Sequence, residues 1–142
     1  MKTIFLDTNL IIDFLADRRP FSLLAAEIFN FSLTGQLKIY ISAVSYNNIY
    51  YILRQTLSNN EALRLLNHLG ELTEVADVTK DTIKKALKSE FKDFEDAIQY
   101  YCALSMSKVE LIVTRDSKDF RKSILPVMNP EEALGFIRSP AK

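Results

Sequence analysis

The sequence predicts an α/β fold with three layers, in which helices cover both faces of a mostly parallel central sheet of about five strands. Short apolar runs, which are typical of buried strands, alternate with longer segments whose apolar residues recur at helical spacing. The 142 residues are 48% hydrophobic and 25% charged, which suits a single domain over residues 1–142. Parallel sheets of this kind bind ligands beyond the carboxyl ends of their strands, so we look for functional residues there.

The first half of the chain alternates apolar runs with helical patterns. Residues 3–6 form a short apolar run that stops at Asp7, which predicts a buried strand ending in a turn. Apolar residues then crowd one helical face over 10–15, and the same spacing returns over 22–33 before Gly35 ends it. The elements expected next are a strand over 38–41, a helix over 45–57 capped by Ser42 or Ser45, and a helix capped by Asn59 or Asn60 that ends near Gly70.

The second half continues the alternation. We expect a weak strand over 74–78, a helix over 79–88 and a longer helix over 93–107. A short core strand over 111–113 and an edge strand over 126–128 follow, and Pro130 begins the closing helix, which runs through Ile137. The residues of the 93–107 helix that should face inward are Ala97, Ile98, Tyr101, Cys102 and Leu104.

The composition argues against several classes of protein. Lys and Arg together number 18, and so do Asp and Glu, so a nucleic acid would have to be held by a local patch instead of by net charge. His68 is the only histidine, which argues against a zinc site, a Ser-His-Asp triad or a histidine-based ribonuclease. Cys102 is the only cysteine, so it forms no internal disulfide and should be a small core residue.

The sequence also carries no sign of a membrane segment. No apolar run approaches the roughly 20 residues that span a bilayer, and Asp7 interrupts the first apolar stretch too early for a signal peptide. We therefore expect a cytoplasmic protein without membrane association.

Carboxylates from three separate segments should meet at one edge of the sheet. Asp7 follows the first strand, Asp116 follows the 111–113 strand, and Asp93 and Asp96 share one face at the start of a helix. A single acid in such a place is usually only a cap or a turn residue. Their convergence would crowd like charges unless cations neutralised them. Oxygen ligands without histidine or thiolate favour Mg²⁺ or Mn²⁺, which suit phosphodiester hydrolysis by direct attack of water.

Three motifs, in this order, resemble the successive motifs of PIN domains. They are Leu6-Asp7-Thr8-Asn9, Asp93-Phe94-Glu95-Asp96-Ala97 and Val113-Thr114-Arg115-Asp116-Ser117-Lys118-Asp119-Phe120. The resemblance spans almost the entire chain and is greatest to the VapC-like ribonuclease toxins of type II toxin-antitoxin systems. It implies the three-layer PIN-like fold and an endoribonuclease that uses Mg²⁺ or Mn²⁺ to cut single-stranded RNA.

The resemblance implies roles for residues of all three motifs. The expected catalytic and metal-binding acids are Asp7, Asp96 and Asp116, with Asp93 as a further metal ligand. The residues expected to orient them are Thr8, Asn9 and Thr114. Asp119 would assist Asp116, although it is also placed to cap a short helix that begins near Ser117.

Asn48 departs from the family pattern. PIN enzymes usually carry a glutamate in the first turn of the helix after the second strand, and Asn48 stands at that position. An amide can ligate a metal ion but brings no negative charge, so metal affinity should be lower than with glutamate. Asn48 would also be placed to complete a helix cap begun by Ser45.

Cations near the acidic motifs are candidates for RNA contacts. Arg115 and Lys118 lie within the third motif and would bind backbone phosphates. A lysine stripe over 84–92 leads towards Asp93, but a solvated helix face is the commoner explanation of such a stripe. The family resemblance further implies an RNA substrate, a cognate antitoxin and a second copy of the chain in a homodimer.

Two other functions stay open. A catalytically degenerate domain would bind RNA or protein through the same groove without cleavage, and Asn48 is the main argument for it. A phosphotransfer or phosphatase domain would use Asp7 as a covalent acceptor. Asn9 stands where such phosphatases carry a second aspartate, which disfavours that function.

Overall fold

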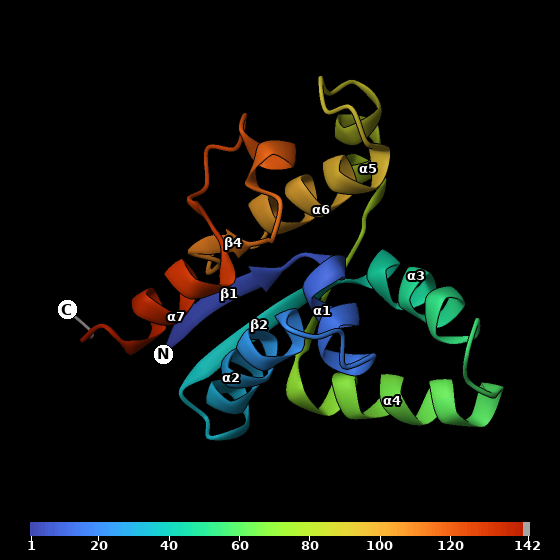
Figure 1. The fold of residues 1–142 in the computed structure, drawn as a ribbon. Helices are drawn as coiled ribbons and strands as arrows, with labels where there is room; N and C mark the ends of the chain where they lie inside the picture. Colours follow the sequence, from blue (N-terminus) through green and yellow to red (C-terminus); the bar gives the residue numbers. More distant parts are fainter. Residues whose placement is uncertain (141–142) are drawn as a thin grey trace.

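The computed structural model describes residues 1–140, which form a sheet of five strands between two layers of helices (Figure 1). The strand order is β3-β2-β1-β4-β5, and every pairing is parallel. The strands are β1 (Lys2–Leu6), β2 (Leu37–Ser42), β3 (Glu74–Ala76), β4 (Leu111–Val113) and β5 (Val127–Met128). The predicted α/β class with about five strands is therefore confirmed.

The helices divide between the two faces of the sheet. They are α1 (Thr8–Leu15), α2 (Phe21–Leu33), α3 (Ala43–Leu53), α4 (Asn59–Leu72), α5 (Lys80–Leu87), α6 (Phe94–Ser105), the 3₁₀ helix η1 (Ser117–Phe120) and α7 (Pro130–Arg138). Ile4 and Leu6 pack in a core with α1, α2, α3, α4 and α7, whereas Phe5 between them packs with α6 on the other face. Each such side chain, fully buried, stabilises the fold by about 1.5–3 kcal/mol.

The start of α3 differs from the prediction. The helix begins at Ala43 instead of residue 45, directly after the end of β2. Strand β2 continues to Ser42, which pairs with Ala76 of β3. Ser42 is then the cap, and its hydroxyl accepts a hydrogen bond from the Val44 N–H. The helix also ends at Leu53 instead of 57, since the chain must turn before α4 begins.

The cap of α4 was also predicted wrongly. Ser58 stands at this position, where either Asn59 or Asn60 was expected. Ser58 and Glu61 form a capping box, in which each side chain accepts from the other residue's backbone N–H. This reciprocal pair satisfies two backbone donors, which neither asparagine would do.

Helix α6 was predicted in the right place but two residues too long at its end. Asp93 is its cap, and the helix ends at Ser105 instead of 107. Ala97, Ile98 and Cys102 are buried as expected, and Tyr101 and Leu104 are half-buried. Gln99 is buried as well, at 2% exposure, although it was not predicted to be.

The strand order places a crevice at the centre of the sheet. The connection after β1 leads to β2 on one side of β1, whereas β4 lies on the other side of β1 and its connection leads outward to β5. The connections after β1 and β4 therefore leave in opposite directions. Such a switch point opens a space beyond the carboxyl ends of the two strands. Asp7 directly follows β1, and Thr114 directly follows β4.

Within residues 1–140, none of the helices has the length and apolar character needed to cross a membrane.

Candidate functional site

Asp7 is held in place by its backbone and by both oxygens of its side chain. Its N–H donates to the carbonyl of Val113 (3.0 Å), which ties the end of β1 to the end of β4. Oδ1 accepts from Gln99 Nε2 (3.0 Å), and Oδ2 accepts from Thr114 Oγ1 (2.8 Å). Asp7 is only 4% exposed, and this burial raises its pKa, against the opposing effect of the Thr114 and Gln99 donors and of the backbone N–H groups of Thr8 and Asn9.

Thr8 joins this site through Gln99. The Thr8 N–H donates to Gln99 Oε1 (3.0 Å), and the Thr8 hydroxyl lies 3.2 Å from the same oxygen. The Thr8 hydroxyl also bonds the buried Ser45 hydroxyl of α3 (2.7 Å). Asn9 is different, because its side chain is exposed and makes no hydrogen bond with any residue that the structure describes.

Asp93 and Asp96 approach from the start of α6. Asp93 Oδ1 accepts from the Asp96 N–H (2.9 Å), so the cap considered from the sequence is present. The pKa of Asp96 is raised to about 7, first by burial and then by the charges of Asp93, Asp7, Asp119 and Glu95. The charges of Asp7 and Asp119, which lie in other segments, therefore act on Asp96.

The loop after β4 brings two further acids. Thr114 is fully buried, and its hydroxyl accepts from the Asp116 N–H (3.1 Å). Asp116 occupies the cap position of η1, so the expectation that Asp119 caps this helix was wrong; Asp119 lies within its first turn. Burial and then the Asp116 carboxylate raise the pKa of Asp119, and Asp7 and Asp93 contribute too.

A pocket of about 300 Å³ opens beside these acids. Asp93, Asp96 and Asp119 form its acidic side. Its basic residues are Lys92, Lys118, Arg121 and Lys122. Lys122 forms an ion pair with Glu90, which also lines the pocket. Acidic and basic groups thus share one space, which is suited to a ligand with both metal-binding and anionic parts.

Arg115 pairs with a buried aspartate. Its Nε and Nη2 donate to the two carboxylate oxygens of Asp13 (2.6 and 3.1 Å), and the Asp13 side chain is completely buried. The guanidinium also lies over the ring of Phe21, 4.0 Å from its centroid. Of the two cations predicted to contact RNA, only Lys118 lines the pocket.

Asn48 lies deeper in its helix than predicted. Because α3 begins at Ala43, Asn48 falls in the second turn instead of the first. Ser42 caps this helix, so Asn48 does not complete a cap begun by Ser45. Its side chain is half-buried and makes no hydrogen bond within residues 1–140.

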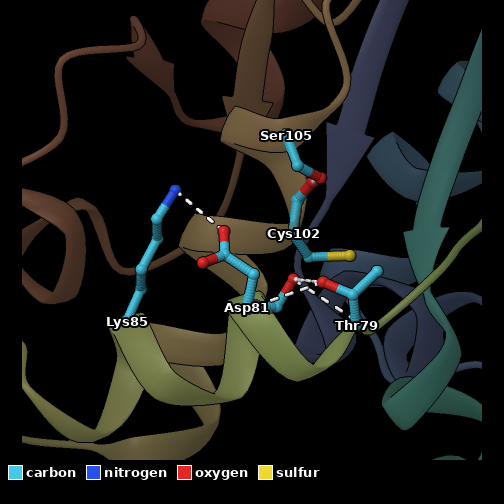
Figure 2. A network of polar contacts seen from close by, with 6 residues as sticks. Thr79, Asp81, Lys85, Cys102 and Ser105 are labelled. Atoms are coloured by element: carbon cyan, nitrogen blue, oxygen red, sulfur yellow. Dashed lines mark hydrogen bonds and ion pairs between the residues drawn. The ribbon is translucent and has the colours of Figure 1, made fainter.

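Two features noted in the sequence lie apart from this site. Figure 2 shows Lys85 of the lysine stripe paired with Asp81 one helical turn earlier (3.0 Å), so its charge is partly neutralised. The same view shows Cys102 on α6 with its sulfur directed into the protein. Cys102 is fully buried, as predicted, and burial raises the pKa of its thiol to about 11.

The ligand chemistry of the site suits a hard cation. In the described part of the chain, no three Asp, Glu, His or Cys side chains lie close enough to share one ion. Mg²⁺ nevertheless keeps several waters in proteins and needs only one or two carboxylates. The available donors are carboxylate, hydroxyl and amide oxygens, while Cys102 is buried elsewhere and His68 is exposed on α4. The residues present therefore fit Mg²⁺ or Mn²⁺ better than zinc.

Sequence reasoning missed three polar residues around the site. Gln99 had a usable signal, because it lies three residues after Asp96 and hence on the same side of α6. Ser45 was considered only as a cap. Asp13 had no local signal, since its partner Arg115 is 102 residues away in the chain.

The comparisons with known proteins show the family to which the chain belongs. A family model described as a PIN domain matches residues 3–118 of the chain. The chain belongs to the PIN-domain family. The search of curated protein sequences found no match.

Solved structures with similar folds include VapC toxins and their complexes. DNA-bound VapBC from Salmonella typhimurium has a TM-score of 0.69 at 16% identity, over 92% of this chain and 99% of that one. A toxin-antitoxin complex from Klebsiella pneumoniae has a TM-score of 0.62 at 22% identity, over 89% and 97%. VapC20 from Mycobacterium tuberculosis, a toxin that cleaves the sarcin-ricin loop, has a TM-score of 0.65 at 13% identity, over 84% and 94%. These likenesses confirm the predicted fold.

Proposed function

We propose that this PIN-domain protein is an endoribonuclease that cuts single-stranded RNA with Mg²⁺ or Mn²⁺, as the toxin of a toxin-antitoxin pair. The observation that carries the proposal is the pocket in which Asp93 and Asp96, from the start of α6, face Asp119 of η1, with the charge of Asp7 also acting on Asp96. Such a concentration of negative charge is stabilised by divalent cations. The basic residues of the adjacent pocket supply a place for an RNA backbone.

Each acid then has a role. Asp7, Asp96 and Asp116 bind the metal and act in catalysis, and Asp93 binds through the oxygen that does not cap α6. Asp119 assists them from the pocket that it shares with Asp93 and Asp96. When bound, the metal ion lowers the pKa of the attacking water and stabilises the leaving oxygen of the cleaved phosphodiester.

The polar neighbours orient these acids and the substrate. Thr114 holds both Asp7 and the backbone of Asp116, and Thr8 acts through Gln99. Asn9 has an exposed side chain next to Thr8 in the chain, and this side chain contacts the RNA. Lys118 binds a phosphate, whereas Arg115 serves the site mainly through its ion pair with Asp13.

The proposed partners are RNA, a cognate antitoxin and a second copy of the chain, with residues 1–142 acting as one domain in the cytoplasm. The similar structure from Klebsiella pneumoniae is a toxin-antitoxin complex, which supports the proposal that an antitoxin binds this chain. Exposed apolar side chains on α2 and α3 provide surface for protein partners. They are Phe21, Leu23, Leu33 and Tyr51.

The test is a titration of Mn²⁺ into wild type and into Asp7→Asn/Asp96→Asn, with cleavage of a labelled single-stranded RNA panel followed in the same samples. Asp81→Asn is a matched control, because it removes an exposed aspartate on α5 that lies outside the pocket. We expect Mn²⁺-dependent cleavage by wild type and by the control, and none by the double variant. Cleavage that persists without these two acids contradicts the proposal.

A non-catalytic domain that binds RNA or protein through the same groove is the second candidate, and Asn48 favours it. Mn²⁺ binding by wild type without cleavage of any RNA would support this candidate. The variant Asn48→Glu adds the missing carboxylate, and we expect it to tighten Mn²⁺ binding. Unchanged affinity would mean that residue 48 does not face the acids.

A further inference from the structure

Gln99 uses all of its polar atoms on two site residues. It lies on α6, three residues after Asp96, and is 2% exposed. Its Nε2 donates to Asp7 Oδ1 (3.0 Å), and its Oε1 accepts from the Thr8 N–H (3.0 Å) and hydroxyl (3.2 Å). Burying an amide costs free energy unless it is hydrogen-bonded in this way, so these bonds favour one orientation of the Gln99 amide.

The orientation of this amide is fixed by chemistry. A backbone N–H can only donate, so the Gln99 atom that faces the Thr8 N–H must be the carbonyl oxygen. The amide nitrogen therefore faces Asp7 and can only donate to it. The assignment of oxygen and nitrogen, often ambiguous for glutamine, has one consistent solution here.

The second oxygen of Asp7 is constrained by the same logic. The Asp116 N–H donates to Thr114 Oγ1 (3.1 Å), so the hydroxyl proton of Thr114 is free to point at Asp7 Oδ2 (2.8 Å). Each oxygen of Asp7 thus receives one side-chain hydrogen bond from a donor whose direction is set by the backbone. The backbone N–H groups of Thr8 and Asn9 also lower the pKa of this carboxyl, but neither completes a cap hydrogen bond, so each oxygen keeps a further acceptor position for another ligand.

We infer that Gln99 is a positioning residue for Asp7, which fixes the carboxylate so that its remaining lone pairs face the cation of the proposed metal site. The inference rests on the proposed metal-dependent function. Because Gln99 and Asp96 are on one helix, it also sets the distance between two acids from different segments. A purely structural glutamine would stabilise the fold but leave metal affinity unchanged, which makes the two roles separable.

The test compares two variants of buried residues in the same network. Gln99→Met keeps the length of the side chain but loses the donor to Asp7. Ser45→Ala removes the bond between Ser45 and Thr8 (2.7 Å) and leaves the donors of Asp7 intact. Mn²⁺ affinity is measured by calorimetry, and the melting temperature by circular dichroism. We expect the Mn²⁺ dissociation constant to rise about 10- to 100-fold in Gln99→Met and to stay unchanged in Ser45→Ala.

A second variant covers the case in which Gln99→Met fails to fold. Gln99→Asn keeps the amide but shortens the side chain by one methylene, so its donor no longer reaches Asp7. This variant adds no charge, so loss of the donor alone acts on the site and we expect weaker Mn²⁺ binding.

The outcomes separate this inference from the proposed function. Wild type that binds Mn²⁺ while Gln99→Met or Gln99→Asn binds it equally well or better overturns the inference alone. Wild type that binds no Mn²⁺ overturns the proposed function and this inference with it.

Discussion

The acidic edge of the sheet has two halves whose surroundings are opposite. The buried half consists of Asp7 with Thr8, Gln99 and Thr114, all at most 5% exposed and all joined by hydrogen bonds. The exposed half consists of Asp93, Asp116 and Asp119, which are exposed, and Asp96, which is half-buried. Asp93 caps the Asp96 N–H, and a side-chain hydrogen bond with Asp116 contributes to the raised pKa of Asp119. The fold thus holds Asp7 by hydrogen bonds to both of its oxygens and gives the other four carboxylates less support.

This difference shows which interactions the fold itself supplies. In the buried half, donors aimed at Asp7 offset part of the cost of burying its charge. In the exposed half, carboxylates repel each other, and the pKa of Asp96 rises to about 7 as a result of burial and this repulsion. Variants of the buried half should therefore cost stability, while variants of the exposed half should change stability little or increase it.

The largest expected effect is on the ion pair that supports the buried half. Arg115→Ala leaves Asp13, which is completely buried, without its partner, so we expect a loss of about 3–5 kcal/mol in the free energy of unfolding. Urea denaturation measures it. Adding Asp13→Asn should recover part of the loss, and Arg19→Ala, which breaks an exposed pair with Asp17, should change little. If Arg115→Ala loses no more free energy of unfolding than Arg19→Ala, the Arg115–Asp13 pair does not anchor the loop after β4.

A smaller loss is expected for the donor to Asp7. Thr114→Val preserves shape but leaves Asp7 Oδ2 without its donor and the Asp116 N–H without its acceptor, at a cost of about 2 kcal/mol. Thermal melting measures the change. Thr56→Val is the control, since Thr56 is exposed, and its effect should stay within about 0.5 kcal/mol. Equal melting temperatures would remove the distinction between the two halves.

The exposed half should respond in the opposite direction. The raised pKa of Asp96 means that the folded protein holds a proton that the unfolded chain has already released, so ionisation destabilises the fold as pH rises from about 4 to about 7. Asp96→Asn should therefore raise the free energy of unfolding by about 1 kcal/mol at pH 8, a figure reduced for solvent screening. The gain should vanish below about pH 4.

Urea denaturation without metal, at both ends of this pH range, measures the effect of Asp96→Asn. A variant that is less stable than wild type at pH 8 would contradict the repulsion among these acids. Mn²⁺ should reverse the order of stability, because only wild type retains the ligand.

The smallest effect on stability is expected at the basic side of the pocket. Lys118 is exposed, so Lys118→Ala should leave the melting temperature unchanged. RNA binding should weaken equally for all sequences, and the slope of log affinity against log salt should fall by about 1. Lys108→Ala is the control, because Lys108 precedes β4 and lies at the opposite edge of the sheet. Equal salt slopes for the two variants would show that Lys118 contacts no phosphate.

Much of the fold could be predicted from local sequence patterns. The 111–113 strand was predicted at its observed bounds and β1 within one residue, because an apolar run of that length has few alternatives to a buried strand. The cap of α4 shows the limit, since Ser58, Asn59 and Asn60 all have the chemistry of a cap. Glu61, three residues after Ser58, was the available signal that decides among them.

By itself, the sequence determined the parallel sheet, the order of the acidic motifs and the strand ends at which Asp7 and Asp116 lie. These follow from spacing and residue type, which act over a few residues. Only the tertiary structure decided that Gln99 faces Asp7, that Arg115 pairs with Asp13, and that Asp119 shares a pocket with Asp96. Such partners are distant in the chain, and packing of α6, α1 and η1 at the sheet edge brings them together.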